Sequence, residues 1–228
     1  MSSIELFQNK TDCCGCSACY NVCPRKAISM QEDEYGYVYP VIDQDKCVGC
    51  GLCRKVCHYQ ADKELRTPIK AYAAAGKKEE FLKKAASGGM FSLVADKILE
   101  EGGVVFGAAM EYHNNTLIPK HIAVESKEEL FKLQGSKYVQ SFIGNTYAEA
   151  KKYLADGRKV LFSGTPCQIE GLKGYLGREY ENLYTIDIIC HGVPNAKWFQ
   201  DYIKVFETKL QGSIYSYNFR DKSRGQGM

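Results

Sequence analysis

The sequence predicts an α+β protein in which a small cysteine-rich domain precedes a larger α/β domain. Nine of the eleven cysteines lie within residues 13–57, and eight of these nine share one spacing. Beyond residue 70, segments with helical spacing of apolar residues alternate with short β-branched and aromatic runs, a pattern typical of a partly parallel sheet covered by helices. Residues 61–68 are charged and end in Pro68, which favours a linker. We therefore expect domains at 1–62 and 70–228, joined by a linker at 63–69.

The eight cysteines form two runs with one spacing, C-x2-C-x2-C-x3-C. The first run is Cys13, Cys16, Cys19 and Cys23, and the second is Cys47, Cys50, Cys53 and Cys57. This spacing is typical of bacterial two-cluster ferredoxins, where three cysteines of one run bind one [4Fe–4S] cluster and the fourth binds the other. We assign Cys13, Cys16, Cys19 and Cys57 to the first cluster, and Cys47, Cys50, Cys53 and Cys23 to the second.

Zinc sites and disulfides are the two alternative uses of these cysteines. Zinc sites are built from two C-x2-C pairs per ion and do not need a third cysteine in each run. Disulfides require an oxidising compartment, and the N-terminus has neither the basic nor the apolar region of a secretion signal, so we expect a cytoplasmic protein. Cys14 does not fit the spacing, and we interpret it as a small packed side chain.

Charge and hydropathy exclude further classes of function. The net charge is +3, with both signs spread along the chain, which argues against nucleic-acid binding. No apolar run approaches the 18 residues of a membrane span. A domain of about 60 residues buries little apolar surface, so we expect iron–thiolate bonds to supply much of the small domain's stability.

The expected elements follow from local patterns. A hairpin at residues 34–41, rich in tyrosine, should pack against the clusters. We expect strands at residues 69–75, 104–109, 120–124, 159–162 and 184–189. We expect helices at residues 91–99, 127–133, 146–154, 169–176 and 197–210.

Two glycine-containing turns of the larger domain could bind a cofactor. Ser87, Gly88 and Gly89 precede a helix, so their amides could face a phosphate, although a plain helix-capping turn has the same sequence. Gly135, Ser136, Lys137 and Tyr138 combine a hydroxyl, a cation and an aromatic ring. That set suits a phosphate and a flat ring system, and it also suits an ordinary exposed turn.

Two cysteines follow strands of the larger domain. Cys167 lies at the start of a helix, where amide dipoles favour a thiolate, and Cys190 follows the strand at 184–189. If these strands are neighbours, the two cysteines lie together and could act as a nucleophile or as metal ligands. The alternative is a pair of buried apolar side chains.

The order of these four segments resembles the coenzyme F420 hydrogenase/dehydrogenase beta-subunit family. The segments are residues 86–89, 135–138, 165–168 and 189–192, and the resemblance extends from about residue 70 to the end. It implies a domain that binds FAD through the turns at 87–89 and 135–138. It also implies a [4Fe–4S] cluster of that domain with Cys167 and Cys190 as two ligands, and electron transfer to the deazaflavin coenzyme F420.

One departure from the family concerns further cysteines, commonly a C-x2-C pair, which are expected downstream of Cys190. The sequence contains none there. We therefore expect a chain truncated at its C-terminus, in which the flavin site and a third cluster are incomplete. A third [4Fe–4S] cluster would form in the full-length protein.

The leading hypothesis is an iron–sulfur flavoprotein oxidoreductase that passes electrons between [4Fe–4S] clusters and a flavin, and on to a hydride acceptor such as coenzyme F420. No side chain is nominated as catalytic. The expected partners are a redox protein or subunit and a small-molecule hydride carrier. One alternative is a ferredoxin module of a larger complex without its own substrate. Another is the same fold using ferredoxin or NAD(P).

Overall fold

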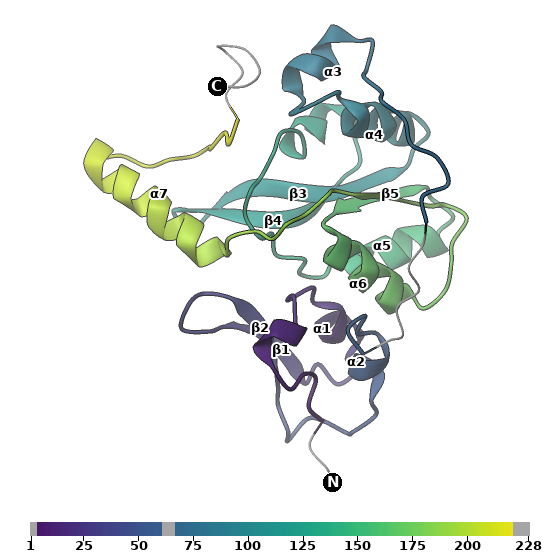
Figure 1. Cartoon of the computed structure of the whole chain (residues 1–228), viewed down its shortest axis with the longest axis vertical. Helices are drawn as coiled ribbons and strands as arrows, with labels where there is room; N and C mark the ends of the chain where they lie inside the picture. The colour runs from purple at the N-terminus through teal and green to yellow at the C-terminus, as the bar shows by residue number, and fades with distance from the viewer. Residues whose placement is uncertain (1–3, 61–66, 221–228) are drawn as a thin grey trace.

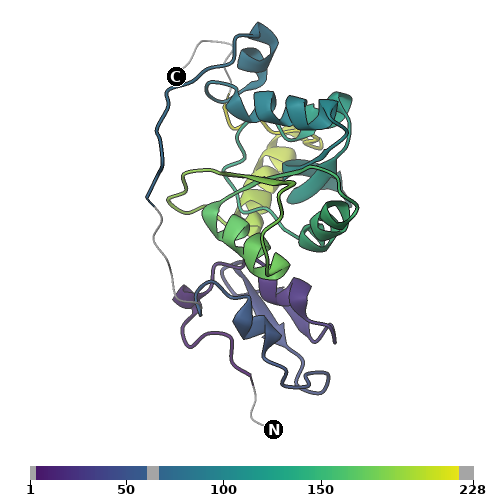
Figure 2. The same cartoon turned by 90° about the vertical axis from the view of Figure 1, so that its right-hand side faces the viewer.

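The computed structural model describes residues 4–60 and 67–220 and shows a mixed α+β protein with two parts (Figure 1). A small ferredoxin-like region lies against one side of a larger α/β region. Residues 63–66 of the predicted linker at 63–69 lie outside the described residues. The segment from residue 67 continues along the side of the larger region towards its far end (Figure 2).

The small region consists of short elements between the cysteines. They are η1 (Lys10–Asp12), α1 (Ala18–Val22), β1 (Ile28–Glu32), β2 (Val38–Ile42) and α2 (Leu52–Lys55). The predicted hairpin is present, and its strands start earlier than expected, with Ile28 opposite Ile42. Its turn is held by the Asp33 carboxylate, which accepts hydrogen bonds from the backbone amides of Tyr35 and Tyr37. The predicted tyrosine-rich stretch therefore forms the turn and the second strand.

The larger region alternates helices and strands as predicted. Its elements are α3 (Glu79–Lys84), α4 (Met90–Glu100), β3 (Val104–His113), β4 (Thr116–Val124), η2 (Lys127–Lys132), α5 (Thr146–Ala155), β5 (Val160–Gly164), α6 (Pro166–Leu176), β6 (Leu183–Asp187) and α7 (Ala196–Leu210). The sheet order is β4-β3-β5-β6, in which β3, β5 and β6 are parallel and β4 is antiparallel to β3. The prediction of a partly parallel sheet is confirmed.

Helices cover both faces of this sheet. On one face, Val104, Phe106 and Phe162 pack against α5 and α6 in a single apolar cluster. On the other face, Val105 and Leu161 pack against α4 and η2. Because successive strand residues point to opposite faces, the continuous apolar runs of β3 and β5 are those of strands buried on both sides.

Three of the predicted elements differ from the structure. Residues 69–75 form no strand: Ile69 is 95% exposed and Tyr72 is 80% exposed, and the segment pairs with no strand among the described residues. An apolar run cannot form a strand without a neighbouring edge to supply hydrogen bonds. The strand predicted at 184–189 ends at Asp187, and the helix predicted at 127–133 is the 3-10 helix η2.

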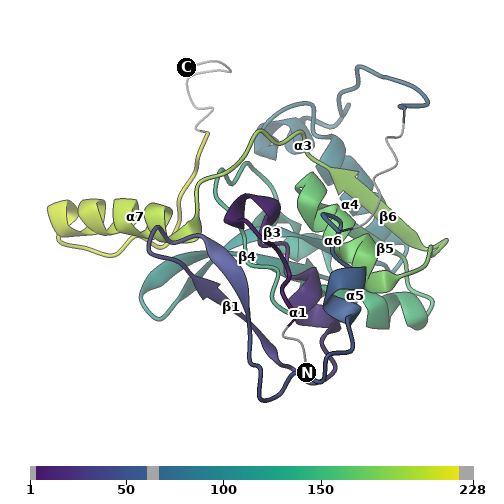
Figure 3. The same cartoon turned by 60° about the horizontal axis from the view of Figure 1, so that its bottom comes forward.

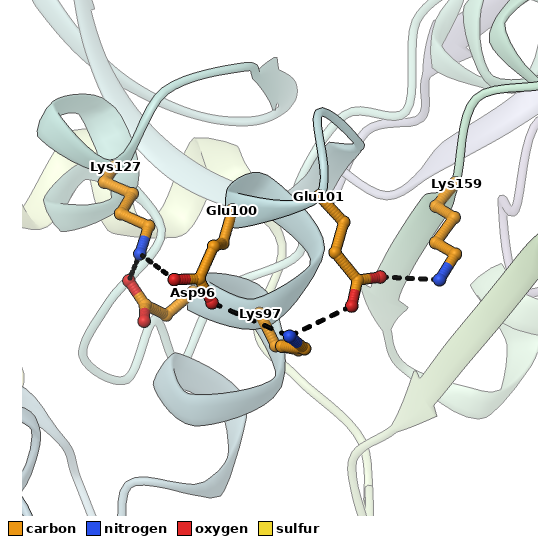
Figure 4. Close-up of polar contacts among 6 residues, drawn as sticks. All are labelled: Asp96, Lys97, Glu100, Glu101, Lys127 and Lys159. Atoms are coloured by element: carbon orange, nitrogen blue, oxygen red, sulfur yellow. Dashed lines mark hydrogen bonds and ion pairs between the residues drawn. The ribbon is translucent and has the colours of Figure 1, made fainter.

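An ion-pair network joins α4 to its neighbours on the protein surface (Figure 4). Lys127, at the start of η2, lies 3.0 Å from Asp96 of α4. Glu101 contacts both Lys97, at 3.1 Å, and Lys159, which precedes β5. These side chains are largely exposed, so each pair adds only about 0–1 kcal/mol. The position of α4 on the sheet face therefore depends mainly on its apolar contacts.

The two regions meet at α6 and α5. The Tyr147 hydroxyl of α5 lies 2.9 Å from the carbonyl oxygen of Cys16 and 2.8 Å from that of Gln168. Both oxygens can accept its hydrogen bond. A Cβ atom at Gly174 of α6 would lie 2.4 Å from the carbonyl oxygen of Val56, and one at Gly171 would lie 3.1 Å from the sulfur of Cys16. The small region therefore packs directly on the glycine face of α6.

Helix α7 extends away from the rest of the chain (Figure 3). Its buried face, with Phe199 and Ile203, packs against Leu117 of β4. Its opposite face carries Trp198, which is 70% exposed. Among the described residues, no helix is long and apolar enough to cross a membrane.

Candidate functional site

Five cysteines of the small region line one pocket, the four predicted for the first cluster and Cys14. Cys13, Cys16, Cys19 and Cys57 all line it, together with apolar side chains that include Leu6 and Met30. The turn before α1 is tight: Gly15 has φ +66°, and a Cβ there would lie 2.7 Å from the carbonyl oxygen of Val38. This turn directs the first three cysteines of the run towards one centre, and Cys57 reaches the same pocket from after α2.

The other four cysteines of the two runs surround a second pocket. Cys23, Cys47, Cys50 and Cys53 line it together with Ile28 and Ile42 of the hairpin. The structure thus groups the eight cysteines in the same two sets as the spacing predicts, with the fourth member of each run in the pocket of the other. Ligation of a metal by these residues stays a prediction.

Burial disfavours the charged form of three of these thiols, those of Cys13, Cys19 and Cys53. It raises the pKa of Cys13 to about 11 and raises the pKa of Cys19 and of Cys53 above the ordinary value, because an apolar surrounding disfavours the thiolate. Such cysteines hold thiolates when a cation replaces the protons. A backbone amide already points at one sulfur, since Ala27 donates to Cys23 at 3.3 Å. Both pockets fit a sulfur-ligated iron cluster.

A cavity of about 870 Å³ lies between the two regions. It opens at the carboxyl ends of β5 and β6, the edge at which α/β sheets usually bind ligands. All seven residues predicted to bind a cofactor line it, namely Ser87, Gly88, Gly89, Gly135, Ser136, Lys137 and Tyr138. Cys167 and Cys190 line it as well. Their shared location agrees with the prediction, and their individual roles stay untested.

The small region contributes part of the cavity wall. Lys10, Tyr37 and Tyr39 line it from η1 and the hairpin, and Cys13 and Cys14 line it from the first cysteine run. Cys13 therefore belongs both to the first cysteine pocket and to the cavity. The two spaces share a wall.

Lys137 is not a free cation. Its ammonium group donates to the carbonyl oxygens of Lys132 and Gln134, at 3.1 and 2.8 Å. Burial lowers its pKa to about 8, so the side chain is held at the end of η2 and shapes the turn that follows. The two contacts give Lys137 a structural role. Its predicted binding of a phosphate stays a prediction.

Cys14, predicted to be a small packed side chain, is half-buried and contacts His58. Its sulfur lies 4.0 Å from Nε2 of His58, and its thiol interacts with the thiols of Cys16 and Cys167. Cys14, Cys16 and His58 form a group whose possible ligand atoms lie within 4.8 Å of one another. The spacing of each cysteine run concerns only residues that are close in sequence. It therefore does not reveal which residues of the other region lie near Cys14.

Cys167 is the second residue of α6, as predicted, and lies next to Thr165, whose hydroxyl is 3.1 Å from its sulfur. The interaction with Cys14 lowers the pKa of Cys167, whereas the pKa of Cys14 is raised, first by its interaction with Cys16 and then by that with Cys167. Strands β5 and β6 are neighbours, also as predicted. Cys190 follows β6 and is exposed. In the part of the chain that is described, the close group of metal-ligating side chains includes neither Cys167 nor Cys190.

A buried polar network behind the cavity was missed by the sequence reasoning. His121 of β4 is 1% exposed. Its Nε2 donates to the carbonyl oxygen of Ser163 at 3.0 Å, so its Nδ1 accepts from the Ser141 hydroxyl at 2.8 Å. Gln168 donates to that same hydroxyl oxygen at 3.2 Å. The imidazole therefore holds β4, β5 and the loop before α5 together.

Among the residues of this network, only Gln168 belongs to a recognisable sequence motif. Thr165 and Gln168 form a capping box at the start of α6, and the pattern of a threonine followed three residues later by a glutamine predicts such a box. His121 lies in an apolar strand with no neighbouring motif. Burial lowers its pKa to about 4, which keeps it neutral near pH 7.

Comparison with known proteins gives three family matches. Residues 12–61 match the 4Fe-4S dicluster domain. Residues 71–145 match the coenzyme F420 hydrogenase/dehydrogenase beta subunit N-terminal family, and residues 157–227 match the corresponding C-terminal family. The matches cover both regions of the structure.

Individual relatives cover the chain to different extents. The coenzyme F420-dependent sulfite reductase of Methanocaldococcus jannaschii is 24% identical over 191 residues, which are 80% of this chain and 28% of the relative. A ferredoxin of the same organism is 33% identical over 55 residues, 24% of this chain and 70% of the relative. A chain of the F420-reducing [NiFe] hydrogenase complex from Methanosarcina barkeri has a TM-score of 0.45 at 23% identity, covering 57% of this chain and 47% of that chain.

The buried histidine generates a pH dependence of stability. The pKa of His121 is about 4 in the folded chain against the ordinary 6.5, so the unfolded chain binds more protons between these values. Stability is therefore present above pH 6.5 and lost as the pH falls towards 4. From about pH 7.5 to about pH 5.5 we expect His121 to lower the free energy of unfolding by ~1 kcal/mol, measured by urea denaturation under anaerobic conditions.

Two glutamine substitutions test this assignment. The His121→Gln variant should be less stable than the wild type at about pH 7.5 and should lack this part of the pH dependence. His113, on the same β-hairpin, is exposed, so His113→Gln should keep the full dependence. Equal slopes for the wild type and His121→Gln would contradict the role given to His121.

Proposed function

Because the chain belongs to the coenzyme F420 hydrogenase/dehydrogenase beta-subunit family and carries an iron–sulfur electron-transfer domain, we propose that it is an iron–sulfur flavoprotein oxidoreductase. Electrons would enter or leave through two [4Fe–4S] clusters and reach a flavin in the cavity. A hydride acceptor such as coenzyme F420 would exchange with the flavin. The match covers 28% of the length of the sulfite reductase, so the activity of that whole relative is not assigned to this chain.

The proposed cluster ligands are the two sets of four cysteines. Cys13, Cys16, Cys19 and Cys57 would hold the first cluster, and Cys23, Cys47, Cys50 and Cys53 the second. Apolar side chains around the sulfurs exclude water, and the backbone amide of Ala27 donates to the sulfur of Cys23. Both would tune the potential at which electrons move. Cys50 is exposed, so the second pocket is the one closer to a redox partner protein.

The cavity fits a cofactor of the size of FAD. Its volume of about 870 Å³ lies in the range of pockets that enclose large small-molecule ligands. Gly88 and Gly89 expose backbone next to the start of α4, where amides can bind a phosphate, and Tyr138 offers an aromatic face. When bound, a flavin supplies the exchange between single electrons and hydride. The surrounding side chains bind and orient it and need no acid or base of their own.

One observation carries the proposal: Cys13 lines both the first cysteine pocket and the cavity. A cluster bound by Cys13 would therefore lie directly against the cavity wall, and electrons would not have to cross a further protein layer. A ferredoxin module without its own substrate has no need of a large cavity at this wall. The shared wall therefore favours a flavoprotein oxidoreductase over a ferredoxin module without its own substrate.

The hydride carrier and a third cluster are the remaining parts of the proposed electron path. Coenzyme F420 is supported as the hydride carrier by the family and by the named F420-dependent relative, while NAD(P) and ferredoxin are the acceptors to compare with it. A third cluster with Cys167 and Cys190 as ligands stays a prediction. The proposal uses two clusters, because the match to a 4Fe-4S dicluster domain covers residues 12–61, which contain the eight cysteines of the two runs.

Iron content tests the cluster assignment. Anaerobically purified protein should contain about eight iron atoms per chain. The Cys16→Ser variant should lose roughly four of them, and the small region should unfold more readily, because its stability depends on the metal. Cys14→Ser changes an adjacent thiol outside the two sets and should retain the iron. Equal losses in the two variants, or zinc in place of iron, would show that the assignment is wrong.

Flavin content tests the use of the cavity. Denaturing the purified protein should release about one flavin per chain if one cofactor fills the cavity. Ala108→Phe places a ring in the cavity wall and should lower the flavin content while the iron content stays unchanged. Ala73→Phe makes the same change at an exposed position and should alter neither. Wild-type protein with full iron and no flavin would favour the ferredoxin module instead.

A further inference from the structure

The two cysteine runs contain the same backbone turn in different surroundings. In the first run the turn is at residues 14–15, and Gly15 has φ +66°. In the second run it is at residues 48–49, and Gly49 has φ +69°. A Cβ at Gly15 would lie 3.1 Å from Nε2 of Gln140, whereas a Cβ at Gly49 would meet no other part of the described chain within 4 Å. The larger region therefore covers one of the two equivalent turns.

The larger region contacts the first turn through a hydrogen bond. The side-chain amide of Gln140 donates to the carbonyl oxygen of Cys14 at 3.1 Å. Only the NH₂ end of a glutamine amide can donate, so the positive end of its dipole faces this peptide. Val48, which occupies the position of Cys14 in the second run, is 56% exposed. The donor is therefore a difference between the two runs that their common spacing does not contain.

Gln140 is presented to the turn by a well-anchored segment. Its backbone amide donates to the carbonyl oxygen of Pro194 at 2.9 Å. The hydroxyl of the next residue, Ser141, is held by His121 at 2.8 Å and by Gln168 at 3.2 Å. Gln140 is half-buried and lines the cavity of about 870 Å³. Its side chain therefore connects the cavity wall to the first cysteine run.

The peptide that accepts this hydrogen bond also carries the backbone amide of Gly15. Burial raises the pKa of the Cys13 thiol to about 11, and a hydrogen bond from the Gly15 amide acts in the opposite direction. Hydrogen bonds in a chain polarise one another, so donation to the carbonyl strengthens donation by the amide of the same peptide. Hydrogen bonds to the sulfurs of a cluster stabilise the negative charge that one-electron reduction adds. Removing the Gln140 donor would weaken this stabilisation.

We propose that Gln140 is a positioning residue that raises the reduction potential of the first cluster through the peptide between Cys14 and Gly15. The inference rests on the proposed function, because it requires a cluster in the first cysteine pocket. The donor favours an electron on the cluster beside the cavity over an electron on the cluster in the pocket with the exposed Cys50. Electrons are thereby held next to the proposed flavin.

Two substitutions of Gln140 test the effect of the donor. Gln140→Met keeps the length of the side chain and removes the donor, and Gln140→Glu replaces the donor with a carboxylate. Anaerobically purified protein with about eight iron atoms per chain should show two one-electron steps in a redox titration followed by EPR. Gln140→Met should lower the equilibrium constant for reduction in one step by roughly twofold to tenfold, the range of one net hydrogen bond. Gln140→Glu should lower it further, because a negative charge opposes reduction.

Gln134→Met is the matched control. Gln134 lines the same cavity, and its side-chain amide donates to the hydroxyl of Ser92 at 3.0 Å instead of to a cysteine run. This variant should leave both steps unchanged. Cys50→Ser should retain roughly four iron atoms, those of the first cluster. Gln140→Met should still shift the remaining step in that background.

Four results would overturn the inference. Gln140→Met could leave both steps unchanged at full iron content, or it could shift the step that is lost in Cys50→Ser. Gln134→Met could shift the same step equally. Gln140→Met could lose roughly four iron atoms, which would show that the amide holds the cluster instead of tuning it. Wild-type protein without iron would contradict the proposed function as well, whereas two intact clusters with unmoved potentials would overturn this inference alone.

Discussion

The close packing of the ferredoxin-like region on α6 is the constraint on which the candidate site depends. Gly171 and Gly174 present a helix face without side chains, and the backbone of Val56 approaches it so closely that any Cβ at Gly174 would collide with a carbonyl oxygen. The Tyr147 hydroxyl bridges the same contact by reaching the carbonyl of Cys16. If the two regions separated, the first cysteine pocket and the cavity would no longer share a wall.

This packing also supplies apolar burial that the small region cannot provide alone. Ala18 and Val56 belong to the same core cluster as Phe106 and Phe162 of the sheet. The small region is therefore stabilised from two directions, by contacts with α5 and α6 and by the iron–thiolate bonds proposed for its pockets. The metal sites and the domain interface are coupled, because Cys16 belongs to both.

Local patterns predicted much of the fold. Most helices, the order of strands with helices between them, and the two sets of four cysteines were accessible from spacing alone. The predicted strand at residues 69–75 was wrong because an apolar run does not reveal whether a partner strand is available, and Ile69 is almost fully exposed. The positions of Cys167 and Cys190 at the ends of neighbouring strands were also correctly inferred from the alternating pattern.

The contacts between the regions could not be predicted in the same way. The contact between Gln140 and Cys14 joins residues from two separate folding units, and nothing in either motif specifies how the units pack. The glycine face of α6 is visible in the sequence only as two glycines within a helix, which normally lowers the confidence of a helix. His121 had no signal, because its role depends on Ser141 and Ser163, which are distant in sequence.

The central claim is that one iron cluster lies at the wall of a flavin-binding cavity formed by both regions. An anaerobic crystal structure with diffraction data collected at the iron absorption edge tests it most directly. The account predicts two iron clusters, one among Cys13, Cys16, Cys19 and Cys57 and one among Cys23, Cys47, Cys50 and Cys53, with flavin density between the turns that contain Gly88 and Tyr138. Iron bound outside these two pockets, or a flavin bound away from this cavity, would contradict it.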